Sequence, residues 1–164
     1  MKTLFLVRHA KSSWDESGLS DRDRPLAERG ERDAPEMARR LARRGVNPDL
    51  ILSSPAHRAL ATAKIIAEAL DYKRKNIDID DRLYPGRVSE LLRMIRALDD
   101  KLECVMLFGH NPALAELAHH LSHAITRMPT CAVVELGLDA NSWSEIDSTT
   151  LARVSLDYPK KRSG

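Results

Sequence analysis

The segment Thr3-Leu4-Phe5-Leu6-Val7, followed at once by Arg8-His9, lies at the start of the 164-residue chain. A short, uninterrupted apolar run that ends at charged residues is typical of a β-strand buried on both faces. Similar runs predict strands over 49–53, 77–79 and 104–108. Helices are predicted over 27–44, 55–70, 88–98 and 112–121. Strands that alternate with helices indicate an α/β fold, a three-layer α/β/α sandwich with a mostly parallel central sheet.

Local patterns also predict where elements begin and where the domain ends. In Ser54-Pro55 and Asn111-Pro112 a side-chain acceptor precedes a proline, the pattern of an N-cap followed by the first helical residue. After residue 130 the sequence is mainly of a kind typical of β-strands, which predicts strands over 131–138, 143–146 and 152–158. We expect one domain over residues 1–158 and a polar C-terminal tail over 159–164.

The composition restricts the classes of function and location. The 26 Lys and Arg residues nearly balance the 24 Asp and Glu residues, so the net charge of +2 excludes a strongly basic nucleic-acid binder. The first apolar run is too short for a secretory signal, and no run approaches the ~20 apolar residues of a membrane span. We therefore expect neither nucleic-acid nor membrane partners. Cys104 and Cys131 lie in apolar runs, so we expect reduced thiols and a cytoplasmic protein.

Histidine stands beside arginine or an amide after three of the predicted strands. The pairs are Arg8-His9, His57-Arg58 and His110-Asn111. Because ligands of open α/β sheets bind beyond the carboxyl ends of the strands, we expect these side chains to surround one pocket. Arginines, imidazoles and helix N-termini without clustered acids are typical of a phosphate site. The alternative is that each pair caps a helix or lies on the surface with no shared purpose.

Four motifs in the chain resemble those of the histidine phosphatase superfamily, whose fold is shared with cofactor-dependent phosphoglycerate mutases. They are Leu6-Val7-Arg8-His9-Ala10-Lys11-Ser12, Pro25-Leu26-Ala27-Glu28-Arg29-Gly30, Ser53-Ser54-Pro55-Ala56-His57-Arg58-Ala59 with Thr62-Ala63, and Gly109-His110-Asn111-Pro112. Ala10 departs from the glycine of the family's first motif, a change that a negative φ accommodates. The last motif has the form typical of short bacterial phosphohistidine phosphatases of the SixA type.

The resemblance implies a role for each matching residue. His9 would be a nucleophile that becomes transiently phosphorylated, while Arg8, Arg58 and His110 would hold the phosphoryl oxygens. The two guanidinium groups would also keep the His9 imidazole neutral, as nucleophilic attack requires. No metal or cofactor is expected, because the arginines supply the positive charge. Further candidates for contact with the substrate are Lys11, Ser12, Asp15 and Asn111.

The resemblance does not identify the acid that would protonate the leaving group. Asp81 and Glu90 are candidates, but neither matches a family motif cleanly. A phosphoramidate needs less acid assistance than an ester, which favours phosphohistidine on a protein as the substrate. The short segment 71–102 leaves little chain for a lid, which also favours a protein surface. Two alternatives remain open: a small-molecule phosphomonoesterase or mutase on the same fold, and a non-catalytic phosphate-binding module.

Other chemistry-bearing residues have simpler interpretations. His119 and His123 lie four residues apart on a predicted helix, a spacing that suits metal ligands, but they lie off its apolar face, which favours surface histidines. Neither cysteine begins a Cys-x5-Arg motif, which excludes a cysteine-dependent phosphatase. Trp14 either contacts the substrate or fixes its own loop; the sequence decides neither this nor the oligomeric state.

Overall fold

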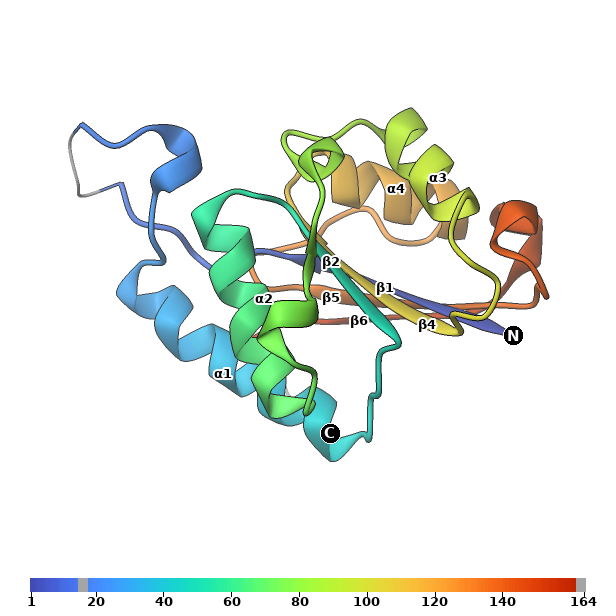
Figure 1. Ribbon diagram of the computed structural model, residues 1–164, viewed down its shortest axis with the longest axis horizontal. Coiled ribbons are helices and arrows are strands. Elements are labelled where there is room, and N and C mark those ends of the chain that lie inside the picture. Colours follow the sequence, from blue (N-terminus) through green and yellow to red (C-terminus); the bar gives the residue numbers. More distant parts are fainter. Residues whose placement is uncertain (15–17, 162–164) are drawn as a thin grey trace.

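The central sheet of the computed structural model has six strands in the order β3-β2-β4-β1-β5-β6 (Figure 1). The structure describes residues 1–14 and 18–161. The strands are β1 (Lys2–Arg8), β2 (Leu50–Ser53), β3 (Asp78–Ile79), β4 (Cys104–Gly109), β5 (Val133–Leu138) and β6 (Leu151–Asp157). The first four in this order are mutually parallel, whereas β5 is antiparallel to both β1 and β6. The prediction of a mostly parallel sheet is confirmed.

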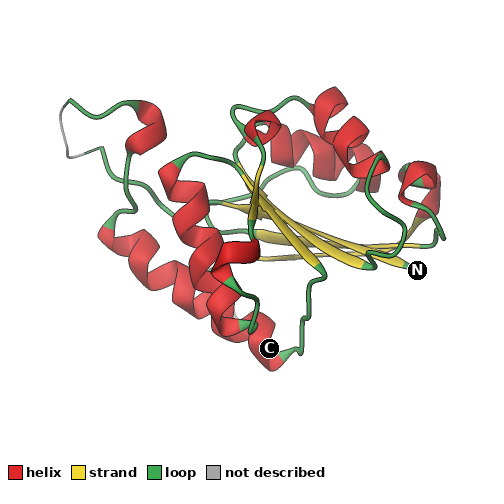
Figure 2. Cartoon of the chain, viewed as in Figure 1, coloured by secondary structure: helices red, strands yellow, loops and turns green. Residues whose placement is uncertain are grey.

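Helices cover both faces of the sheet and complete the three-layer sandwich expected from the sequence, as Figure 2 shows. They are α1 (Glu28–Arg43), α2 (His57–Ala69), α3 (Val88–Arg96) and α4 (Ala113–Ser122). One core lies between the sheet and the pair α1 and α2, and contains Phe5 and Val7. The other core lies beneath α3 and α4, and contains Leu4 and Leu6. Alternate residues of β1 therefore enter opposite cores, which explains its continuous apolar run.

The predicted strand over 143–146 is wrong. Residues Trp143–Glu145 form a 3-10 helix in which the Ser142 hydroxyl accepts the N–H of Ser144 at 3.2 Å. The Trp143 side chain is fully buried, and its indole N–H donates to the carbonyl of Leu102 at 2.8 Å. The apolar pattern here reflects the burial of one aromatic side chain rather than pairing in the sheet.

The predicted N-cap of α2 is also wrong. The helix begins at His57 with Ala56 in the N-cap position, so Ser54 and Pro55 belong to the loop that follows β2. The Ser54 hydroxyl accepts the N–H of Ala56 at 3.1 Å and contacts a side chain from another strand end, described below. The Ser54 side chain, predicted from the local pattern to cap the helix, thus makes a tertiary contact.

α4 likewise begins one residue later than predicted, at Ala113, with Pro112 in the N-cap position. The Asn111 side-chain oxygen still accepts the N–H of Ala115, at 3.3 Å. Asn111 therefore stabilises the first turn of α4 from one residue before the N-cap.

No helix in the described part of the chain is both long and apolar enough to cross a membrane.

Gly30, near the start of α1, marks a close approach between this helix and the segment after β1. A Cβ on Gly30 would overlap the carbonyl oxygen of Lys11 and lie 3.0 Å from its amide nitrogen. Replacing glycine by alanine inside a helix ordinarily stabilises it by about 1 kcal/mol. We expect Gly30→Ala instead to lower the free energy of unfolding by roughly 2–3 kcal/mol, because a backbone must move. Urea denaturation measures this change, and an unchanged or raised free energy would contradict it.

Candidate active site

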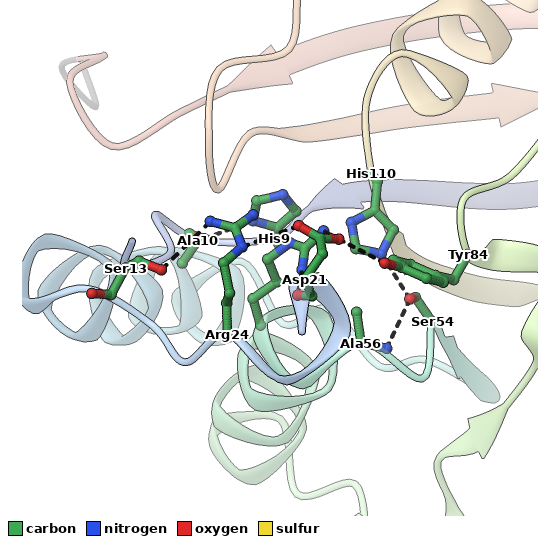
Figure 3. A network of polar contacts seen from close by, with 10 residues as sticks. His9, Ala10, Ser13, Asp21, Arg24, Ser54, Ala56, Tyr84 and His110 are labelled. Carbon is green, nitrogen blue, oxygen red and sulfur yellow. Dashed lines mark hydrogen bonds and ion pairs between the residues drawn. The ribbon is translucent and has the colours of Figure 1, made fainter. Parts of the chain in front are cut away.

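Three parallel strands end side by side, and the residue after each of them enters the same small region (Figure 3). His9 follows β1, His110 follows β4 and Ser54 follows β2. Backbone hydrogen bonds align these ends: the His9 N–H donates to the carbonyl of Gly109 at 3.1 Å, and the Ser54 N–H donates to that of Phe108 at 2.9 Å. The predicted convergence at the carboxyl ends of the strands therefore arises directly from the sheet register.

His9 is buried, with 7 % of its surface exposed, and its tautomer follows from its contacts. Its Nδ1 lies 2.7 Å from the carbonyl oxygen of Ala10. Because that oxygen can only accept, Nδ1 carries the proton and Nε2 keeps the lone pair. Burial above all, and then the charges of Arg58 and Arg8, lower the pKa of His9 to about 4, although the bond to Ala10 acts in the opposite direction. At neutral pH His9 is a neutral imidazole able to act as a nucleophile.

Ala10 is tied to the same cluster through its backbone. Its N–H donates to the hydroxyl of Thr62 at 3.0 Å, and that hydroxyl donates to the carbonyl of Arg58 at 2.8 Å. Ala10 is fully buried and is not among the described non-glycine residues with positive φ. Its methyl group therefore fits where the family's motif has glycine, as expected from the sequence.

His110 faces His9, and the ring centres lie 5.2 Å apart. Its Nε2 is 2.7 Å from the Ser54 hydroxyl, which already accepts the N–H of Ala56. The hydroxyl can accept this N–H and donate its own proton to Nε2, an arrangement in which Nδ1 carries the ring proton and is a donor. Burial, the neighbouring His9 and the charge of Arg58 lower the pKa of His110 to about 3. His110 is thus a neutral donor whose orientation Ser54 sets.

Arg8 and Arg58 bring two more buried donors to these histidines. Within the described residues, Nε of Arg8, Nε of Arg58 and Nδ1 of His110 are buried without a hydrogen-bond partner. A buried donor without a partner costs about 1–3 kcal/mol. Burial and the charge of Arg58 lower the pKa of Arg8, as expected for two cations held close together. Three unpaired donors around one neutral imidazole indicate a site built for an anion.

Asp21 also belongs to this cluster, although it was not among the residues predicted from the sequence (Figure 3). Arg58 donates from one terminal nitrogen to the Asp21 backbone carbonyl at 2.7 Å and from the other to the carboxylate at 3.0 Å. Tyr84 and Arg24 donate to the same carboxylate at 2.6 and 3.1 Å. These bonds, above all the one from Tyr84, lower the pKa of Asp21 to about 2. An ionised carboxylate therefore occupies donors of Arg58 that a bound anion would also use.

Several known proteins are similar to this chain in sequence and in structure. The histidine phosphatase superfamily (branch 1) matches residues 4–84. A crystal structure from Agrobacterium tumefaciens, of a protein described as a SixA phosphohistidine phosphatase, has a TM-score of 0.73 and 32% sequence identity. The similarity covers 84% of this chain and 92% of that one. The chain belongs to the histidine phosphatase superfamily.

Two more proteins are similar to this chain. An uncharacterized chloroplastic protein of Arabidopsis thaliana is 36% identical over 152 residues, which is 88% of this chain and 70% of that protein. The structure of the protein histidine phosphatase SixA complexed with tungstate has a TM-score of 0.76, at 22% identity and over 95% and 94% of the two chains. At that identity it shows the shared fold. As a histidine phosphatase, the chain is a hydrolase that acts on phosphorylated substrates.

The four residues expected to be catalytic in this phosphatase lie together: Arg8, His9, Arg58 and His110. Of the residues expected to contact substrate, Ser12 is buried in a bridge to Leu26, and Lys11 is exposed beside Arg8. The Asn111 amide donates to the carbonyl of Met128 at 2.9 Å, so this side chain holds the loop that also anchors Arg8. Asp15 lies outside the described residues.

Three other candidates lie elsewhere. His57 is exposed on the first turn of α2, so only two of the three junction histidines enter the cluster. Asp81 and Glu90, the candidates for the leaving-group acid, line a cavity of about 550 Å³ that Tyr84 also borders. In the part of the chain that the structure describes, neither carboxyl group is hydrogen-bonded to Arg58 or Tyr84, which both donate to the carboxylate of Asp21.

Trp14 is 73% exposed, and the guanidinium of Arg24 stacks 3.4 Å from the centre of its ring. Because Arg24 also binds Asp21, this stacking helps to hold the loop that carries Asp21. Contact of Trp14 with the substrate, the other alternative from the sequence, stays open.

His119 on α4 and His123, the residue that follows this helix, do not form a metal site with other side chains that the structure describes. His119 and His123 are exposed, and their ring centres are 6.1 Å apart. Across residues 1–14 and 18–161, no three His, Cys, Asp or Glu side chains are grouped so that they could hold a metal ion. Surface histidines are the interpretation that fits this arrangement.

The lowered pKa of His9 predicts how the enzyme behaves in acid. An unfolded histidine has a pKa near 6.5, whereas that of folded His9 is about 4. The unfolded state therefore binds more protons between these values, and we expect the free energy of unfolding to decrease as pH falls from about 6.5 to 4. Proton NMR of the His9 ring, assigned with His9→Gln, should show titration near pH 4; titration near 6.5 would contradict the burial argument.

Proposed function

We propose that this phosphatase hydrolyses phosphohistidine on a protein through a covalent phosphoryl-His9 intermediate. One observation carries the proposal: buried donors on Arg8, Arg58 and His110 lack partners in the described structure while His9 Nε2 keeps its lone pair. This set combines a nucleophile with donors for the oxygens of a phosphoryl group. The SixA protein solved with tungstate, a tetrahedral oxyanion, supports a similar use of this fold.

In the first step, Nε2 of His9 attacks the phosphorus and the bond from phosphorus to the substrate nitrogen breaks. The three equatorial oxygens carry the charge of the transition state and accept hydrogen bonds from Arg8, Arg58 and His110. The Ala10 carbonyl holds the Nδ1 proton of His9 throughout, so the positive charge that develops on the imidazole is stabilised by that oxygen. The phosphoryl group takes the place of the Asp21 carboxylate on Arg58.

In the second step, water attacks phosphoryl-His9 on the phosphorus. The new bond joins the water oxygen to phosphorus, and the electron pair of the breaking bond returns to Nε2. The water protons leave with inorganic phosphate or pass to solvent. After the phosphate leaves, the Asp21 carboxylate binds Arg58 again and balances its positive charge.

The state of Asp21 supports a nitrogen leaving group over an alkoxide. Its pKa of about 2 means that the carboxylate in the cluster is ionised at neutral pH and has no proton to donate. An alkoxide needs such a proton, whereas the substrate imidazole leaves readily when protonated by solvent. We therefore favour phosphohistidine over small phosphate esters, although a phosphomonoesterase or mutase activity on the same fold remains the second candidate.

The test compares two peptides of one sequence, one with phosphohistidine and one with phosphoserine at the same position. We expect kcat/KM to be at least about 100-fold higher for phosphohistidine. A higher value for phosphoserine, or for small sugar phosphates, would show that the second candidate is right. Binding of both peptides without turnover of either would show a phosphate-binding module.

The two cysteines bear on the proposed location. Cys104 and Cys131 are free thiols, and burial raises the pKa of each to about 12. Thiols that form no disulfide suit a reducing compartment. On this ground we propose a cytoplasmic location.

A further inference from the structure

A cavity of about 450 Å³ opens beside Arg8, and positive charge predominates in its walls. The lining side chains with a positive charge are Arg8, Lys11, Arg29, Arg127 and Lys160. Asp33 is the acidic residue among those that line it. The formal charge of this wall is therefore +4, whereas the whole chain carries +2. We call this feature the basic cavity.

The basic cavity is built from segments that lie far apart in the sequence and are fixed by hydrogen bonds. Arg29, on the first turn of α1, donates to the Thr130 hydroxyl at 2.9 Å. Arg40, further along α1, donates to the carbonyls of Tyr158 and Pro159, each at 2.9 Å. Both acceptor segments line the cavity. These two wall segments are thus held in place by α1, and the cavity is not a row of side chains along one helix.

Arg8 connects the basic cavity with the active site. Its buried Nε has no partner in the described structure, and one terminal nitrogen donates to the carbonyl of Met128 at 3.1 Å. Arg8 also lines a neighbouring cavity of about 300 Å³, together with Arg127 and Asn111. A substrate whose phosphoryl group lies on His9 therefore has basic side chains on its Arg8 side.

We propose that the basic cavity binds a second anionic group, a carboxylate or a second phosphate, of the substrate whose phosphoryl group is transferred to His9. The position of that phosphoryl group rests on the proposed function. Arg29 pairs with Asp33 at 3.5 Å, and the other four cations around this small volume repel one another. An anion bound among them relieves this repulsion and is concentrated there. On a protein, the second group is an acidic side chain near the phosphohistidine; on a small molecule, it is another substituent.

The test removes two cations that have no role in the phosphoryl site. Arg127 and Lys160 are exposed and line the cavity, so the test variant is Arg127→Gln with Lys160→Gln. The matched control is Arg43→Gln with Lys64→Gln, which removes the same charge from exposed positions on α1 and α2 outside the basic cavity. The substrates are phenyl phosphate and its carboxylated analogues, and phosphohistidine peptides with glutamate or glutamine beside the histidine.

We expect the test variant to lose about 10-fold in kcat/KM on a substrate with the second anionic group, mainly through KM, and less than 2-fold on its neutral partner. The control variant should change both substrates equally. Calorimetric binding of phenylphosphonate and carboxyphenylphosphonates gives the same comparison without turnover. Equal losses on charged and neutral substrates in the test variant, in both measurements, would overturn the proposal.

The two substrate pairs show whether the second anionic group belongs to a protein or to a small molecule. They also test the basic cavity independently of the proposed function. Selectivity for the glutamate peptide, lost in the test variant, identifies an acidic protein segment as the ligand. Selectivity for the carboxylated aryl phosphates alone identifies a small anionic substrate. If no phosphohistidine peptide is hydrolysed but the carboxylated aryl phosphates lose selectivity in the test variant, the basic cavity stands and the proposed function fails.

Discussion

His9→Ala is expected to lower kcat at least about 1,000-fold, because it removes the atom that forms the covalent bond to phosphorus. The buried donors on Arg8, Arg58 and His110 remain in this variant, so it should still bind inorganic phosphate. Loss of turnover with retained phosphate binding distinguishes a missing nucleophile from a damaged site. Steady-state hydrolysis and calorimetric titration with phosphate measure the two quantities.

His57→Ala is the matched control for His9→Ala. His57 is also a histidine beside an arginine after a strand, but it is exposed and lies outside the cluster. We expect its kcat to stay within 2-fold of the unaltered enzyme. A phosphoryl group trapped on the enzyme by rapid quenching should be absent from His9→Ala and present in His57→Ala. Equal trapping in both variants would exclude His9 as the nucleophile.

The positions of His9 and His110 could be predicted because they depend on the ends of two buried strands. A continuous apolar run such as Thr3 to Val7 locates a strand, and parallel neighbours place the residues after their ends together. Arg58 follows from the same rule, since it lies on the first turn of the helix after β2. For these residues, local pattern and tertiary structure agree.

Asp21 could not be predicted from local pattern. It reaches Arg58 across 37 positions of sequence, from a short polar 3-10 helix, Asp21–Asp23, that has no apolar periodicity. The cap prediction at Ser54 was wrong for a related reason, because its hydroxyl binds His110 across 56 positions. In both cases a long-range polar contact decides where the side chain lies. Asp81, a candidate acid from the sequence, borders another cavity.

Arg58→Lys should separate the geometry of this cation from its charge. The guanidinium uses two terminal nitrogens for the carbonyl and carboxylate of Asp21 and keeps Nε buried without a partner in the described structure. An ammonium group presents a single nitrogen and cannot reproduce this planar fork. We expect kcat/KM to fall about 100-fold and the inhibition constant of inorganic phosphate to rise. Arg39→Lys, at an exposed ion pair on α1, is the control and should leave both values unchanged.

The pH dependence of the same variant provides the sharper comparison. The charge of Arg58 helps to lower the pKa of His9, and lysine retains that charge, so His9 in Arg58→Lys should still titrate near pH 4. Arg58→Gln removes the charge as well, and the pKa of His9 should then rise toward 6.5. Two variants with similar losses of kcat/KM but different His9 titrations would show that Arg58 holds the phosphoryl group through its geometry and keeps the nucleophile neutral through its charge. If Arg58→Lys retained kcat/KM within 3-fold, charge alone would account for its role.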